Sequence, residues 1–86
     1  MNLDEQEFLQ AVGLRIRTRR EAQNLTQAQL GDNCDLDRTF VGSVERGERN
    51  VAILNLRKIA LALRVPLRDL LADQDDRASG GGEEEG

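Results

Sequence analysis

The 86-residue sequence has no histidine, tryptophan or tyrosine and only one cysteine, and these absences exclude several classes of protein. Without histidine the usual metal sites and acid-base pairs are missing, so we expect no metal, no cofactor and no enzymatic activity. A single cysteine cannot form an internal disulfide. Cys34 is interpreted as a small buried apolar residue, with redox sensing as the alternative.

Long apolar runs are absent as well. No stretch approaches the roughly 18 apolar residues of a membrane span, and the N-terminus is acidic rather than basic. We therefore expect neither a membrane segment nor a signal peptide, and a cytoplasmic protein. One proline and two aromatic residues favour helices over strands. A chain this short forms one domain and buries only about 60% of its unfolded surface, which predicts modest stability.

Negative charge is unevenly distributed along the chain. The net charge is −4, but residues 73–86 hold six acidic residues and one arginine, a net of −5. Residues 1–72 therefore carry +1, and residues 38–68 within them carry +5. A local basic face decides phosphate binding, whatever the overall charge. We expect a nucleic-acid-binding domain over residues 1–72 and an acidic, disordered tail over residues 73–86, with competition between tail and nucleic acid as the alternative.

A short helix is predicted to begin at Gln27. Thr26 and Gln29 have the spacing of a capping box, in which each side chain bonds the other residue's backbone N–H. Leu30 and Cys34, four residues apart, give this helix one apolar face.

A second short helix is predicted after a tight corner. Asp35 tolerates the left-handed conformation that a sharp turn needs, and Asp37 can cap the next helix. Val41 and Val44, three residues apart, point inward from that helix. Gly47 suits the left-handed position that ends it.

Three further helices are predicted around this corner, which makes an all-α bundle of five helices. The first spans residues 3–22 and carries an apolar column at i+4 spacing, formed by Phe8, Val12 and Ile16. The fourth has a core face formed by Leu56, Ile59, Ala60 and Leu63. Its start is poorly capped, so Asn50 is expected to serve as the cap. Pro66 starts a short fifth helix.

The chain resembles the helix-turn-helix regulators of the phage repressor and Cro family from about Leu14 to Leu71. The residues that carry this resemblance are Leu14-Arg15-Ile16-Arg17, Arg20, Leu25-Thr26-Gln27, Glu45-Arg46-Gly47 and Leu56-Arg57-Lys58-Ile59-Ala60 before Leu63. Those that look most like the controller proteins of restriction-modification systems are Leu36-Asp37-Arg38-Thr39-Phe40 and Arg49-Asn50-Val51. The resemblance implies a lambda-repressor-like fold and a DNA-binding regulator that activates at one site and represses at another.

An ion pair is expected between the first and third helices. Arg20 follows Ile16 in the apolar column of the first helix, and Glu45 follows Val41 in the third. A cation at the edge of a buried face needs a partner, and the family pattern pairs these two positions. In the alternative interpretation, Arg20 extends into water at a frayed helix end.

The third helix carries the residues expected to read DNA bases. A helix of this length fits the major groove, where base edges present a sequence-specific pattern of donors and acceptors. Arg38 can bond guanine O6 and N7 together, and Thr39 can meet a base or a phosphate. Phe40 can pack on a thymine methyl or a sugar, and Ser43 is expected to point outward.

Four more residues are expected to contact DNA outside this reading face. Gln27, in the first turn of the preceding helix, offers its side-chain amide and unpaired backbone N–H groups to a phosphate. Arg49 and Asn50 follow the third helix and would flank the groove, as in the family. The resemblance to controller proteins adds Arg46, with favourable interaction at the helix C-terminus as the alternative.

Exposed leucines predict a dimer. Leu54 and Leu61 lie beside the core face of the fourth helix, where they either form a partner surface or widen the core. The expected dimer interface consists of Leu54, Leu61, Leu67 and Leu71. Because one such module touches few bases, we expect a homodimer on a pseudo-palindromic operator, with RNA polymerase as a further candidate partner. The alternatives are a phage-type repressor and an antitoxin whose main partner is another protein.

Overall fold

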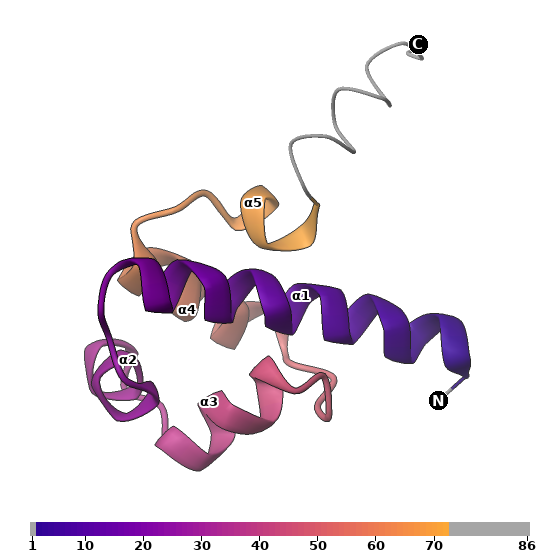
Figure 1. Cartoon of the computed structure of the whole chain (residues 1–86), viewed down its shortest axis with the longest axis horizontal. Coiled ribbons are helices and arrows are strands. Elements are labelled where there is room, and N and C mark those ends of the chain that lie inside the picture. The colour runs from indigo at the N-terminus through magenta and orange to yellow at the C-terminus, as the bar shows by residue number, and fades with distance from the viewer. Residues whose placement is uncertain (1, 73–86) are drawn as a thin grey trace, which may run out of the picture.

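Five α-helices and no strand make up residues 2–72, the part of the chain that the computed structural model describes (Figure 1). They are α1 (Leu3–Ala22), α2 (Gln27–Cys34), α3 (Arg38–Glu45), α4 (Ile53–Leu63) and α5 (Leu67–Leu71). Figure 1 shows α1 running the length of the molecule, with α2 and α3 on one side and α5 on the other. This confirms the predicted all-α bundle. The predicted acidic tail, residues 73–86, lies outside the described residues.

The ends of α2 and α3 follow local signals in the sequence. The Thr26 Oγ1 accepts a hydrogen bond from the Gln29 N–H at 3.0 Å, and the Gln29 side chain returns one to the Thr26 N–H at 2.8 Å. Asp35 ends α2 in the left-handed conformation, with φ of 60°. The Asp37 side chain caps α3, and Gly47 follows α3 with φ of 76°. All four predicted helix boundaries are therefore confirmed.

The start of α4 differs from the prediction. Its N-cap residue is Ala52, which has no side chain able to accept a hydrogen bond, so the expected cap at Asn50 is wrong. Asn50 lies two residues earlier in the α3–α4 loop and is exposed. Because no cap holds this helix end, packing of its apolar face has to stabilise α4.

The apolar core lies where all five helices meet. Its buried residues are Val12, Ile16, Leu30, Cys34, Val41, Val44, Leu56, Ile59, Ala60, Leu63 and Leu70. Burial raises the pKa of the Cys34 thiol, which agrees with its interpretation as an apolar residue. Phe8, predicted to extend the α1 column, is instead 52% exposed. The first turns of α1 extend past α3 and α5 (Figure 1), and Phe8 lies before Val12, the first buried residue of that helix.

Within the described residues, no helix combines the length and the apolar character that crossing a bilayer requires.

Candidate nucleic-acid interface

A buried ion pair fixes the C-terminal end of α3 against α1. The Arg20 Nε donates to the Glu45 Oε2 at 2.6 Å, and the Arg20 Nη2 donates to the Glu45 Oε1 at 3.0 Å. Arg20 is 8% exposed and Glu45 is 7% exposed. The hydrogen bonds to Glu45 raise the pKa of Arg20 against the opposing effect of burial. The bridge expected from the sequence is present, and it sets the position of α3.

Gln27 extends this network to α2. Its Nε2 donates to the Glu45 Oε1 at 3.0 Å, so the carboxylate holds α1, α2 and α3 together. The side-chain amide of Gln27 is expected from the sequence to contact a phosphate, but one of its two N–H groups is already bonded to Glu45. The backbone N–H groups of Gln27 and Ala28 at the start of α2 can still donate to an anion, whereas the Gln29 N–H is bonded to Thr26.

The first turn of α3 presents Arg38 and Thr39 to solvent, whereas Phe40 is half-buried. Within residues 2–72 the structure gives the Arg38 guanidinium no hydrogen bond and no ion pair. The opposite side of the helix is held in the core by Val41 and Val44. Arg38 and Thr39 therefore lie where the sequence predicted a reading surface.

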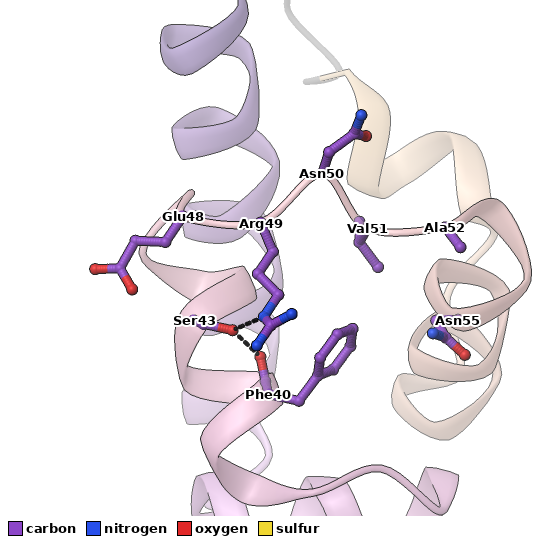
Figure 2. Close-up of a pocket in the computed structure, with 8 residues that line it drawn as sticks. All are labelled: Phe40, Ser43, Glu48, Arg49, Asn50, Val51, Ala52 and Asn55. Carbon is purple, nitrogen blue, oxygen red and sulfur yellow. Dashed lines mark hydrogen bonds between the residues drawn. The ribbon is translucent and has the colours of Figure 1, made fainter. Parts of the chain in front are cut away.

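Ser43 does not point outward, and that expectation is wrong for the free protein. Its side chain lies under the guanidinium of Arg49 and the residue is only 7% exposed (Figure 2). The Ser43 Oγ donates to the carbonyl of Phe40 at 2.7 Å and accepts from the Arg49 Nε at 3.0 Å. Ser43 can therefore reach DNA only if Arg49 moves aside.

Arg49 lies in the loop after α3, as the sequence predicted, and its side chain contacts α3. Its guanidinium carbon is 5.2 Å from the centroid of the Phe40 ring, a cation–π distance. Figure 2 shows the neighbouring Asn50 side chain turned away from Phe40 and Arg49. The two loop residues thus differ, because only Arg49 adds its charge to the α3 surface.

A hollow of about 570 Å³ opens between α3 and the start of α4 (Figure 2). It is lined by Phe40, Ser43, Glu48, Arg49, Asn50, Val51, Ala52 and Asn55. The hollow therefore joins the surface of α3 to the α3–α4 loop.

Arg46, directly after α3, forms an exposed ion pair that the sequence did not predict. Its Nε and Nη2 donate to the two carboxylate oxygens of Glu48 at 2.9 Å and 3.1 Å. These bonds raise the pKa of Arg46 and lower the pKa of Glu48. Residues two apart on a helix do not face each other, so their spacing gave no signal. The pair forms because the helix ends at Glu45 and the chain turns at Arg46 and Gly47.

Comparison with known proteins agrees with this geometry. A helix-turn-helix family model matches residues 16–70. Control protein C.MunI of Mycoplasma sp is 40% identical over 57 residues, 66% of this chain and 77% of C.MunI. Control protein C.BamHI of Bacillus amyloliquefaciens is 48% identical over 48 residues, 56% of this chain and 59% of C.BamHI.

The crystal structure of the restriction-modification controller protein C.AhdI from Aeromonas hydrophila has the same fold. It matches with a TM-score of 0.75 and 43% identity, over 78% of this chain and 97% of C.AhdI. The resemblance stated from the sequence is confirmed. The chain belongs to the helix-turn-helix family of DNA-binding transcriptional regulators, and its relatives within that family include controller proteins.

Proposed function

We propose that this protein is a homodimeric controller protein of a restriction-modification system, acting in the cytoplasm on an operator upstream of its own gene. The observation that carries the proposal is the pair of exposed side chains, Arg38 and Thr39, on a helix whose other side is anchored by Glu45. The names of the relatives support the restriction-modification assignment. Operator position would then decide whether RNA polymerase is recruited or blocked.

The proposed contacts are of two kinds, contacts to DNA bases and contacts to the DNA phosphate backbone. Arg38, Thr39 and Phe40 lie on the exposed side or edge of α3 and read the major groove. The phosphate backbone of the DNA is contacted by residues at the start of α2 and around the α3–α4 loop, which are Gln27, Arg46, Arg49 and Asn50. Ser43 joins the base-reading group once Arg49 releases it.

Arg38→Ala is expected to weaken operator binding by about 1 to 3 kcal/mol and to change binding to random DNA much less. A lost guanine contact matters only where that guanine is present, so sequence preference should relax at one base pair per half-site. The measurement is a titration against operator DNA, located by footprinting the upstream region, and against a random duplex. Arg17→Ala is the matched control, because it removes an exposed arginine from α1, outside the proposed DNA contacts and the proposed dimer surface.

Arg49→Ala provides the contrast in the same titrations. It should weaken binding to both DNAs comparably and flatten the dependence of log affinity on log salt, because one phosphate contact and its counterion are lost. The base-reading assignment fails if Arg38→Ala weakens both DNAs equally while Arg49→Ala removes only operator preference. Absence of any protected site upstream of the gene would contradict control of the protein's own promoter.

The proposed dimer surface is centred on α4. Leu54 and Leu61 are 69% and 61% exposed, and their spacing of seven residues places them on one face of the helix. Leu71 is 36% exposed, whereas Leu67 packs partly against the core and has less surface to offer. These apolar side chains gain free energy when a second copy covers them.

Leu61→Asp is expected to raise the dimer dissociation constant at least about tenfold, because a carboxylate would be desolvated in an apolar interface. Sedimentation equilibrium measures this constant. Leu14→Asp on α1 is the control, because Leu14 is also 61% exposed but lies outside the proposed surface. The surface is wrong if wild type is monomeric at high micromolar concentration, or if Leu14→Asp dissociates the dimer equally.

A further inference from the structure

The ion pair between Arg46 and Glu48 lies beside residues proposed to bind DNA. Arg46 follows the last residue of α3, and Glu48 lines the same hollow as Phe40 and Arg49 (Figure 2). Both side chains of the pair are exposed, at 58% and 56%. A carboxylate in this position cancels the charge of one proposed DNA contact.

The pair occupies the Nε and Nη2 edge of the Arg46 guanidinium, an edge through which arginine can bind an anion bidentately. Arginine binds a phosphate or a guanine bidentately through two N–H groups that lie parallel. In Arg46 the Nε and Nη2 groups both bond to Glu48, at 2.9 Å and 3.1 Å. The remaining nitrogen lies against α3, since a Cβ built on Gly42 would be only 3.2 Å from the Arg46 Nη1. Arg46 can therefore bind DNA bidentately only if its hydrogen bonds to Glu48 are broken.

We propose that Glu48 is an intramolecular competitor that occupies Arg46 in the free protein and so lowers the affinity of each protomer for DNA. The inference rests on the proposed DNA contact of Arg46. Because Arg46 must leave Glu48 on operator and random DNA alike, Glu48 sets the strength of binding and leaves the sequence preference to α3. A protomer weakened in this way needs the second half-site for stable occupancy.

Glu48→Gln is the central variant, because it keeps the shape of the side chain and removes its charge. Affinity for a random duplex should rise about two- to fivefold per protomer at about 0.1 M salt, because the exposed ion pair no longer has to be broken before Arg46 contacts DNA. The gain on operator DNA should be the same, because Arg46 is released from Glu48 in both cases, and the gain should shrink as salt rises, because salt screens the ion pair in wild type. Fluorescence anisotropy with labelled duplexes measures all three quantities.

Two further variants separate local competition from general repulsion of DNA by a carboxylate. In an Arg46→Ala background, Glu48→Gln should gain less than about twofold, since no guanidinium remains to be released. Glu21→Gln should also gain less than about twofold. It removes a carboxylate from the Arg17–Glu21 pair on α1, whose side chains are 59% and 55% exposed. Melting temperatures of all variants should match their parents, because the altered groups are on the surface.

Three outcomes overturn the inference. An equal gain in the Arg46→Ala background would mean that Glu48 only repels DNA. Lower affinity in Glu48→Gln would mean that Glu48 positions Arg46 for binding. Unchanged affinity in both Glu48→Gln and Arg46→Ala would mean that Arg46 does not contact DNA. The proposed function would still hold in that case, provided that wild type binds the operator. A wild type that binds no operator contradicts the proposed function itself.

Discussion

Glu45→Ala is expected to cost about 3 to 5 kcal/mol of the free energy of unfolding, because it leaves the buried Arg20 guanidinium with the exposed Glu21, 4.0 Å from its Nη2, in place of its buried partner. Two strong hydrogen bonds to Arg20 disappear, and the Gln27 amide loses its acceptor as well. This cost is comparable to the whole stability of a domain of this size, so most of the variant should be unfolded. The chain has no tryptophan or tyrosine, so urea denaturation is best followed by far-ultraviolet circular dichroism.

The matched control for this loss is Glu48→Ala. It also removes a carboxylate with two hydrogen bonds to one arginine, but the pair that it breaks is exposed. Water solvates the released arginine there, so the free energy of unfolding should hardly change. A double-mutant cycle between Arg20 and Glu45 then tests the buried pair directly. Additive losses in that cycle would show that the two residues stabilise the fold independently.

Gly13→Ala is expected to destabilise the fold by about 2 to 3 kcal/mol, although alanine is the better helix former by about 1 kcal/mol. A Cβ on Gly13 would lie 2.3 Å from the carbonyl oxygen of Glu45 and 2.4 Å from that of Val44. These are backbone atoms and cannot rotate away, so α3 has to move off α1. The melting temperature should fall by about 10 °C or more, since 1 kcal/mol corresponds to about 4 to 8 °C in a small domain.

Gly42→Ala makes the same chemical change in α3 and serves as the control. The atoms nearest to its new Cβ are the ends of the Gln27 and Arg46 side chains, both at 3.2 Å, which can shift. Its melting temperature should therefore stay the same or rise. Equal stability of Gly13→Ala and wild type would mean that α1 and α3 do not approach as closely as described. Because the displacement of α3 moves Arg38, the Gly13 variant should also lose operator affinity.

Gly13 and Gly42 differ in what surrounds them, and this difference depends on the tertiary structure. In the sequence, a glycine inside a predicted helix indicates only a locally weaker helix, and nothing marked Gly13 as a helix crossing. The close approach depends on where the end of α3 lies, more than 30 residues later in the chain. Only the packed structure supplies that position.

The local elements of this protein were determined by the sequence itself. Capping by Thr26 and Asp37, the left-handed turn at Asp35 and the apolar spacings all act within four residues, so the helices could be predicted from composition and order alone. The Arg20–Glu45 bridge was predictable over a longer distance, because both residues continue apolar columns and the family pattern pairs them.

The side-chain contacts within the candidate interface were decided by the tertiary structure. Ser43 and Arg49 are six residues apart, and Arg49 covers Ser43 because the loop after Gly47 folds back over Phe40. The same loop places Glu48 on Arg46, while Asn50 turns away from α3. Helical periodicity ends where a helix ends, so it cannot assign a direction to loop side chains. Their partners follow from the path of the backbone between α3 and α4, and that path exists only once both helices are packed on the core.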